Sequence, residues 1–276
     1  MTLATPADIL RRHGLKPKKE WGQNFLGDER ILATLAALAR LQPGDTVIEL
    51  GAGLGHFTRA LAAPGAHVVA VERDPELVPI LKNELKDLDV EVEAGDAKQV
   101  DLPAHALRAG GPVVVCGNLP YHLSSPILFH VLDHRQAVKR AVFLLQREVA
   151  ERVAAPPGGR DYGLLAVLLG LHADARVGLD VPREAFTPPP AIESSALVLD
   201  FLPAPRAAIV DDLRFRALVK AAFAQRRKTL WNALKPLAGA REALEKTGID
   251  PQRRGETLSV AEFAAIEREM VGPPSP

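Results

Sequence analysis

The chain has 276 residues, of which 47% are hydrophobic and 25% charged, a typical composition for a globular protein of one or two domains. Its 34 basic and 34 acidic residues cancel, which excludes a uniformly basic nucleic-acid-binding surface. The longest apolar stretch, Gly163–Leu171, is too short for a membrane-spanning helix, and the single cysteine excludes an intrachain disulfide.

Two features indicate the cellular compartment. The N-terminal residues contain no apolar core followed by a small-residue cleavage site, as a secretion signal would. A single cysteine is typical of the reducing cytosol. We therefore expect a cytoplasmic protein without membrane contact, and nothing in the sequence requires more than a monomer.

Charge is nevertheless segregated along the chain. The segments Arg11–Lys19 and Arg214–Lys235 carry basic residues and no acid, whereas Glu72–Asp101 is rich in acids. Such basic segments are either solvated helix faces or nucleic-acid contacts, and charge alone leaves both interpretations open.

In chain order, the first predicted element is an amphipathic helix over Asp28–Leu41, with Asp28 as its N-cap. Residues 45–200 then alternate short β-branched runs with helical patterns, which is typical of parallel βαβ units. Strands are expected at Thr46–Leu50, His67–Glu72, Val90–Glu93, Val113–Cys116, Arg140–Leu145 and Ala196–Phe201, and helices at Pro75–Leu88 and Ser125–Leu132. The apolar strands predict a doubly wound, Rossmann-like α/β sheet that is covered on both faces.

A proline-containing linker at Leu202–Arg206 separates this part from a helical one. Further helices are expected at Asp211–Ala224, Lys228–Leu237, Arg241–Thr247 and Val260–Met270. The sequence thus predicts two domains, an α/β domain over residues 1–203 and a small all-helical domain over residues 204–276. The tail Gly272–Pro276 is expected to be disordered.

A glycine-rich turn, Gly51-Ala52-Gly53-Leu54-Gly55, follows the first strand of the sheet. Its glycines allow a sharp turn and a close approach to a ligand. In the dinucleotide fingerprint G-x-G-x-x-G the third glycine would stand at His56, so this spacing suits a ligand without phosphates, such as S-adenosylmethionine. Glu72, which closes the next strand, can accept hydrogen bonds from both ribose hydroxyls, and Asp96, after the third strand, from an adenine amino group.

The most specific chemical signal is Asn118-Leu119-Pro120-Tyr121, directly after the fourth strand. An adenine amino nitrogen is a poor nucleophile because its lone pair is delocalised into the ring. The Asn118 side-chain oxygen and the Leu119 carbonyl can accept its two hydrogens and localise that lone pair. Pro120 stiffens the turn, and Tyr121 offers a face for base stacking, at about 1–3 kcal/mol per base. The tetrapeptide therefore predicts direct methyl transfer to the exocyclic N6 of adenine, which needs positioning and no covalent enzyme intermediate.

At these motifs the chain resembles the ribosomal RNA adenine dimethyltransferase family, enzymes of the KsgA type, over nearly its whole length. Further similar segments are Gly22–Leu26, Gln146–Arg152, Asp161–Gly163, Phe186–Ser194 (with Ile192 in place of the commoner valine) and Ala222–Asn232. The resemblance implies the sheet of a class I methyltransferase. Such an enzyme uses S-adenosylmethionine and releases S-adenosylhomocysteine. The resemblance also implies dimethylation of two adjacent adenines near the 3′ end of 16S rRNA, giving N6,N6-dimethyladenosine, in an assembly intermediate of the small ribosomal subunit.

The resemblance also assigns residues. Residues 1–27 would form a segment that covers the cofactor. The expected cofactor contacts are Asn24, Leu26, Gly51, Gly53, Glu72, Asp96 and Asn118. Phe186 either closes the second face of the target base opposite Tyr121 or anchors the core. The basic side chains Arg226, Arg227 and Lys228 suit phosphate contacts.

Three alternatives remain open. A 23S rRNA adenine N6-methyltransferase of the macrolide-resistance kind would share the cofactor and the tetrapeptide, although the long Phe186–Ser194 loop favours the small-subunit enzyme. A non-catalytic RNA-binding assembly factor could keep the fold, although the intact motifs argue against that as the sole role. DNA adenine methylation is the weakest alternative, because no separate domain is large enough to read a duplex.

Some residues carry no assigned chemistry. His130 and His134 lie one helical turn apart, but no Cys or Glu cluster accompanies them, so no metal site is expected. Cys116 is predicted to be a small buried hydrophobe. Trp21 and Trp231 flank basic segments and can either stack on RNA or pack in the core.

Overall fold

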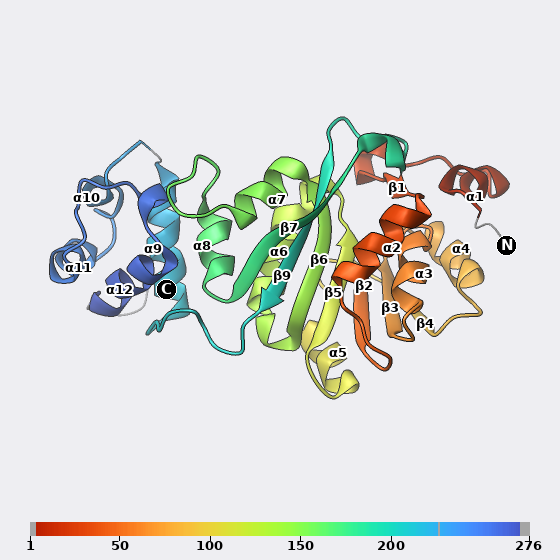
Figure 1. Ribbon diagram of the computed structural model, residues 1–276, viewed down its shortest axis with the longest axis horizontal. Coiled ribbons are helices and arrows are strands. Elements are labelled where there is room, and N and C mark those ends of the chain that lie inside the picture. The colour runs from red at the N-terminus through yellow and green to blue at the C-terminus, as the bar shows by residue number, and fades with distance from the viewer. Residues whose placement is uncertain (1–3, 226, 271–276) are drawn as a thin grey trace. The chain divides into compact units, whose positions relative to one another are not determined.

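The computed structural model describes residues 4–225 and 227–270, which form two compact units (Figure 1). The first unit contains the residues up to Ala150 together with Arg176–Phe201. The second contains Glu151–Ala175 and the residues from Leu202 onward. Arg226 and the tail Gly272–Pro276 lie outside the described residues, so the predictions made for them are not examined by the structure.

The division differs from the single boundary expected near residue 203, because Glu151–Ala175 groups with the helical part. Helix α8 (Leu164–Gly170) in this segment packs against α9 (Asp212–Ala224) and α12 (Val260–Glu269). The Tyr162 ring meets the Phe223 ring edge to face at 6.0 Å. A single boundary position in the sequence could not reveal this grouping, since the grouping depends on contacts between segments far apart in the chain.

A seven-stranded sheet has the order β4-β3-β2-β5-β6-β9-β7. Its strands are β2 (Thr46–Leu50), β3 (His67–Glu72), β4 (Val90–Ala94), β5 (Val113–Asn118), β6 (Val138–Gln146), β7 (Ala173–Val181) and β9 (Ser194–Phe201). Strands β2 to β6 pair in parallel, whereas β9 pairs antiparallel to β6. Residues 182–193, which precede β9, contain no crossover helix of the kind that a parallel connection needs. The predicted α/β class is confirmed, with this antiparallel strand as the exception to its parallel order.

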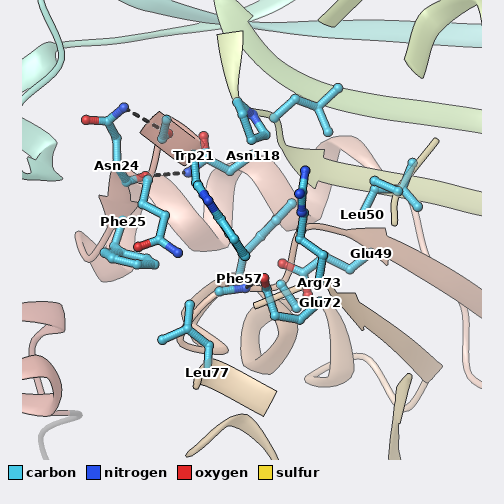
Figure 2. Close-up of a pocket in the computed structure, with 18 of the residues that line it drawn as sticks. Trp21, Asn24, Phe25, Glu49, Leu50, Phe57, Glu72, Arg73, Leu77 and Asn118 are labelled. Carbon is cyan, nitrogen blue, oxygen red and sulfur yellow. Dashed lines mark hydrogen bonds between the residues drawn. The ribbon is translucent and has the colours of Figure 1, made fainter. Parts of the chain in front are cut away.

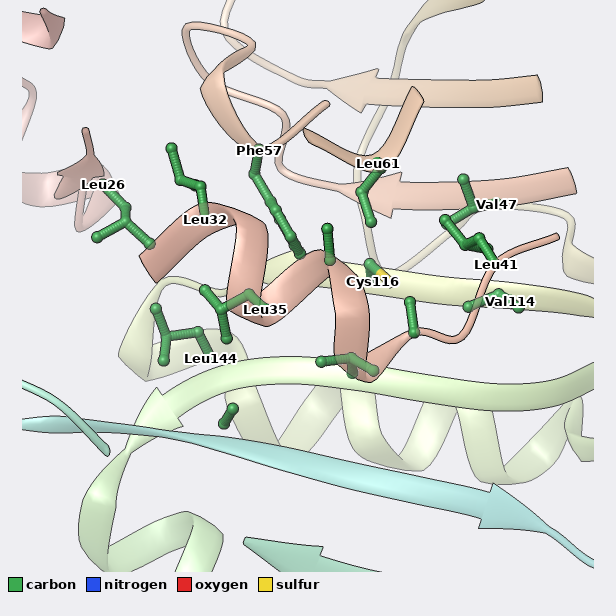
Figure 3. Close-up of a cluster of buried hydrophobic side chains, with 14 of the residues drawn as sticks. Leu26, Leu32, Leu35, Leu41, Val47, Phe57, Leu61, Val114, Cys116 and Leu144 are labelled. Atoms are coloured by element: carbon green, nitrogen blue, oxygen red, sulfur yellow. The ribbon is translucent and has the colours of Figure 1, made fainter. Parts of the chain in front are cut away.

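Apolar side chains fill both faces of the sheet. On one face, α2 (Glu29–Leu38) and α3 (His56–Ala62) pack onto Val47, Val114 and Val142 of three neighbouring strands (Figure 3). The residues that alternate with these valines are also almost fully buried, for example Ile48 and Phe143. Because side chains alternate between the two faces of a strand, the opposite face is covered as well.

The three helices predicted within this part begin within two residues of the expected positions, although α2 ends three residues before the expected Leu41. Asp28 caps α2, accepting hydrogen bonds from the backbone N–H groups of Arg30 and Ile31, as predicted. The other helical elements of this part are α1 (Pro6–Arg12), α4 (Leu77–Glu84), α5 (Leu102–Ala109), α6 (Ser124–Asp133), α7 (Arg147–Ala154) and the short turns η1 (Lys19–Trp21), η2 (Tyr121–Leu123), η3 (Arg135–Ala137) and η4 (Arg183–Ala185).

Two small strands and one edge strand escaped the sequence analysis. Strand β7 lies at the edge of the seven-stranded sheet, and its side chains are mostly exposed or half-buried, so it lacks an apolar pattern. Strands β1 (Phe25–Leu26) and β8 (Phe186–Thr187) form a separate two-stranded antiparallel sheet. Each is too short to carry a periodic pattern.

The second unit is helical, with α10 (Leu230–Ala233), α11 (Ala240–Thr247) and η5 (Gly255–Thr257) beside α8, α9 and α12. Helix α10 is shorter than the predicted Lys228–Leu237, because residues 227–229 are not helical and Pro236 follows its end. The fully buried Glu267 carboxylate accepts hydrogen bonds from the backbone N–H groups of Val210 and Asp211, at 2.8 and 3.0 Å. This bond pair anchors the start of α9 onto α12.

Strand order reverses beside β2. The chain runs from β2 outward through β3 and β4, and then returns to place β5 on the other side of β2. In doubly wound sheets, ligands bind in the crevice at the carboxyl ends of the strands where the order reverses. The turns after β2, β3, β4 and β5 therefore meet at one edge of the sheet.

Candidate functional site

A pocket lies at this edge and encloses about 1020 Å³, part of it open to solvent (Figure 2). It is lined by the ends of β2, β3 and β5, the turn after β4, the segment before α2, and β8. The structure brings together around it every residue predicted to contact the cofactor or the target base: Asn24, Leu26, Gly51, Gly53, Glu72, Asp96, Asn118, Leu119, Pro120, Tyr121 and Phe186. Segments as far apart in the chain as Asn24 and Phe186 thus form one cavity.

The glycine-rich turn after β2 requires glycine for two reasons. Gly51, Gly53 and Gly55 have φ angles of +79°, +57° and +83°, in the left-handed region that side chains disfavour. A Cβ atom at Gly53 would lie 3.1 Å from a Phe25 ring carbon, and one at Gly55 would lie 2.9 Å from a Leu81 methyl group. The turn is therefore packed closely from two sides, and its backbone faces the pocket.

Glu72, at the end of β3, is buried with both carboxylate oxygens oriented by the backbone. Gly53 N–H donates to Oε2 at 2.7 Å, and Asp74 N–H donates to Oε1 at 2.8 Å. Burial raises the pKa of this carboxyl, although the two backbone hydrogen bonds oppose the shift. Each oxygen keeps a further lone pair, so Glu72 can accept hydrogen bonds from two neighbouring hydroxyl groups.

Glu49, two residues before Gly51, also lines the pocket, and the sequence analysis did not single it out. It is 1% exposed, and its Oε2 has no hydrogen-bond partner among the described residues. Burial raises the pKa of this carboxyl to about 8, the nearby Thr58 hydroxyl opposes the shift, and the neighbouring Glu72 carboxylate adds to it. A lone carboxylate within an apolar strand was the available signal, because a buried acceptor without a protein partner points to a donor on a ligand.

Asp96 follows β4 and is the third carboxylate on the pocket wall. Its Oδ1 accepts from the backbone N–H of Lys98 at 3.0 Å, and the Lys98 ammonium lies 3.5 Å from Oδ2. The side chain is 26% exposed, so it remains accessible to a ligand. Together with Glu49 and Glu72 it places three carboxyl groups at this end of the pocket, which we call the carboxylate end.

Residues Lys18–Leu26, which we call the strap, are tied to the turn after β3. The buried Asp74 carboxylate accepts hydrogen bonds from Lys18 Nζ and from Gln23 Nε2, both at 2.8 Å. Although burial opposes it, these bonds lower the pKa of Asp74. The Arg73 guanidinium lies 4.5 Å from the centre of the Trp21 ring (Figure 2). The Lys18 ammonium lies 4.8 Å from the same ring centre.

The strap also orients Asn118, at the end of β5. Asn118 Nδ2 donates to the Asn24 backbone carbonyl at 2.9 Å (Figure 2). Because a carbonyl oxygen can only accept, the amide NH₂ must point to Asn24, and Oδ1 is directed elsewhere. Asn118, which lines the pocket, therefore uses its donor on the strap and keeps its Oδ1 as an acceptor.

The part of the pocket lined by Asn118–Tyr121 and Phe186 we call the transfer end. Its two aromatic residues, Tyr121 and Phe186, are held by separate contacts. The Tyr121 hydroxyl shares a hydrogen bond of 2.9 Å with the Ser194 hydroxyl. Phe186 is 3% exposed and pairs with Leu26 in the two-stranded sheet β1–β8. It both lines the pocket and belongs to the apolar cluster under α2, so the two interpretations offered for Phe186 are compatible.

The other residues singled out from the sequence are not among those that line the pocket. Arg227 and Lys228 are exposed in the second unit. Cys116 is fully buried, as predicted. His130 Nε2 hydrogen-bonds the Val100 carbonyl at 2.9 Å. Among the described residues, three or more His, Cys, Asp or Glu side chains nowhere gather as metal ligands would, and no helix there has the length and apolar character to cross a membrane.

Comparison with known proteins yields a family and close relatives. The ribosomal RNA adenine dimethylase family profile matches residues 14–271. A protein of Myxococcus xanthus named ribosomal RNA small subunit methyltransferase A is 54% identical over 281 residues, covering 99% of this chain and 98% of the relative. A protein of the same name from Moorella thermoacetica is 43% identical over 284 residues, covering 98% and 99%.

Solved structures show the same fold. A dimethyladenosine transferase from Plasmodium falciparum superposes with a TM-score of 0.74 at 24% identity, covering 88% of this chain and 95% of that one. The 23S rRNA methyltransferase ErmE superposes with a TM-score of 0.71, also at 24% identity, covering 90% and 99%. At this identity the likeness concerns the fold alone.

Proposed function

The chain belongs to the ribosomal RNA adenine dimethylase family, and from that premise we propose that it dimethylates N6 of two adjacent adenines near the 3′ end of 16S rRNA. The named relatives, which are small-subunit rRNA methyltransferases, support the small subunit as substrate. The observation that carries the chemistry is the Asn118 amide. Its donor is engaged by Asn24, and its acceptor remains for an adenine amino group at the edge of a pocket with three carboxylates.

The carboxylate end fits S-adenosylmethionine, which we propose as the cofactor. Three carboxylates suit a ligand that carries a sulfonium and an ammonium, and they would repel the phosphates of a dinucleotide. Glu72, with both oxygens already oriented, would accept from the ribose hydroxyls, and Asp96 from the adenine amino group. The orphaned Glu49 Oε2 would receive the ammonium, which supplies the missing donor. Asn24, Leu26, Gly51 and Gly53 would complete the contacts.

When bound, S-adenosylmethionine would supply an electrophilic methyl group on its sulfonium sulfur, and breaking of this carbon–sulfur bond would release the neutral thioether S-adenosylhomocysteine. Asn118 Oδ1 and the Leu119 carbonyl accept the two amino hydrogens of adenine and favour a localised lone pair on N6. The new bond joins N6 to the methyl carbon, and N6 then carries a positive charge. It loses one proton to solvent, so no protein base is required. Tyr121 and Phe186 hold the base between them.

The second unit and the cell compartment complete the proposal. The exposed Arg227 and Lys228, together with Arg226, would contact RNA phosphates. The macromolecular partner would be a small-subunit assembly intermediate in the cytoplasm, bound by a monomer. Single-stranded or looped RNA suits a small helical domain, because its bases are already accessible.

A large-subunit substrate is the second candidate, since ErmE shares the fold. The small-subunit relatives are far more similar in sequence, at 43% and 54% identity against 24%. We therefore rank the small subunit first. Direct comparison of the two ribosomal subunits as substrates separates these candidates. If the protein methylated neither subunit, the non-catalytic binding factor would be the better interpretation.

The test is transfer of tritiated methyl groups from S-adenosylmethionine to small and large ribosomal subunits isolated from cells that lack this modification, followed by nucleoside analysis. We expect N6,N6-dimethyladenosine in 16S rRNA alone. Label in 23S rRNA would replace the substrate assignment. Binding of S-adenosylhomocysteine without any transfer would contradict the catalytic proposal, and the absence of any binding would contradict the cofactor assignment.

A further inference from the structure

The hydroxyl of Ser194 is placed to control the orientation of Tyr121. Ser194 is 1% exposed and stands at the first position of β9, 73 residues after Tyr121 in the chain. The two hydroxyls lie 2.9 Å apart and share a hydrogen bond. Tyr121 itself is half-exposed and lines the pocket, so one end of its side chain is buried and its ring remains accessible.

Ser194 is held rigidly by its neighbours on both sides. Ser194 pairs with Gln146 in the β6–β9 ladder. The preceding residue, Glu193, accepts a hydrogen bond from the Arg147 backbone N–H at 3.1 Å and forms an ion pair with the Arg147 guanidinium at 2.6 Å. The following residue, Ser195, pairs with Leu145 in the same ladder. Because the backbone on both sides of Ser194 is fixed, the Ser194 hydroxyl can define the position of the Tyr121 hydroxyl.

A fixed phenol oxygen restrains the whole ring. A tyrosine side chain has two rotatable bonds before the ring, and a hydrogen bond at its far end limits both. Burial raises the pKa of Tyr121, although the bond to Ser194 opposes the shift, so the phenol stays protonated and serves as an anchor. The ring face then meets the target base at a defined angle.

The restraint matters differently for the two methyl transfers to one adenine. In the first transfer, both amino hydrogens can bind the Asn118 and Leu119 oxygens. The N6-monomethylated base retains one hydrogen, and therefore one of these two bonds. Stacking on Tyr121 must then supply a larger share of the positioning.

We propose that Ser194 is a positioning residue that acts through Tyr121 and is needed chiefly for the second methyl transfer. The inference rests on the proposed function, because it presupposes a dimethylated product. Loss of the Ser194–Tyr121 bond would let the ring reorient. The first methyl transfer would be slowed little, and N6-monomethyladenosine would accumulate.

The test compares Ser194→Ala, Tyr121→Phe and the double variant, with Ser195→Ala as the matched control. Ser195 is an equally buried serine of the same strand, but its hydroxyl binds Asp180. Single-turnover reactions on unmethylated small subunits give the rates of mono- and dimethyladenosine formation. Each single variant should slow the second transfer by about 3- to 10-fold, the effect of one lost hydrogen bond, and the first by less than about 2-fold.

Three results decide the inference. The double variant should be no slower than either single variant, because both changes remove the same bond. Additive losses, a wild-type product ratio in Tyr121→Phe, or an equal change in Ser195→Ala would each overturn it. Tyr121→Phe keeps the ring and needs no change in β9, so it decides the matter even if Ser194→Ala fails to fold. If the wild-type protein forms no dimethyladenosine, the proposed function fails instead.

Discussion

At the carboxylate end of the pocket, Glu72 is held by backbone N–H groups 2 and 19 residues away, whereas at the transfer end Asn118 is held by Asn24, 94 residues away. Tyr121 similarly depends on Ser194, 73 residues away. The carboxylate end thus follows from a turn and adjacent strands of one sheet. The transfer end is assembled by the strap and by the loop before β9.

This difference predicts that substitutions at the two ends of the pocket affect different steps. Changes at the carboxylate end should weaken cofactor binding and leave the geometry of transfer intact. Changes at the transfer end should spare cofactor binding and impair the reaction. The strap is the exception, because Asp74 holds it at one end of the pocket and Asn24 meets Asn118 at the other.

The largest effect is expected for Asn118→Ala at the transfer end. Removing one preorganised polar group from a reaction centre costs about 10²- to 10³-fold in rate. We expect a loss of that size in single-turnover methyl transfer, with the affinity for S-adenosylhomocysteine changed only a few fold. Asn118→Asp retains an acceptor but loses the donor to Asn24, so it should also be impaired. Full activity in either variant would contradict the catalytic assignment.

Glu72→Gln should show the opposite pattern. The substitution removes the charge that strengthens the hydrogen bonds to the ribose hydroxyls. A hydrogen bond with one ionised partner contributes about 1.5–3 kcal/mol. Calorimetry should show S-adenosylhomocysteine affinity reduced by about 10- to 100-fold, with the rate at saturating cofactor changed much less. A rate loss that persists at saturation would show that the two ends are not separable.

Asp74→Asn examines the link between the ends. The substitution replaces an ion pair with Lys18 that is largely shielded from solvent, so we expect a loss of about 3- to 10-fold in cofactor affinity. Because the strap carries Asn24, the saturated transfer rate should also fall. Trp231→Phe leaves Trp21 as the single tryptophan, and its fluorescence then reports whether the strap stays in place. Glu76→Gln, which alters the more exposed partner of Lys18, is the matched control.

The last predicted effect is a pH dependence that comes from Glu49. Its pKa in the fold, about 8, lies above the ordinary 4.5, so the folded protein holds this proton more tightly than the unfolded chain. Its contribution to stability is therefore fully present below the unfolded value and is lost as pH rises through the folded value, at up to about 1.4 kcal/mol per pH unit. A bound ammonium would favour the carboxylate, so cofactor affinity should rise over the same window. Glu49→Gln should flatten both profiles in urea unfolding and calorimetry; unchanged slopes would contradict the assignment.

Much of the fold was predictable from local patterns. Strands β2 and β3 begin and end where expected, since each is an apolar run bounded by turn residues. Strand β7 was missed because an exposed edge strand has no such pattern, and α8 was not assigned to the second unit because that requires knowing its packing partners.

The sequence by itself determined the α/β class, the glycine-rich turn, Glu72, Asp96 and the Asn118–Tyr121 tetrapeptide, because strand, turn and motif signals are local in the chain. Only the tertiary structure decided that Asp74 holds the strap, that the Asn24 carbonyl binds the Asn118 side-chain amide, and that Ser194 anchors Tyr121. These contacts join segments 56 to 94 residues apart. Contacts between such distant residues leave no periodic signature, and they exist only once the sheet has brought the segments together.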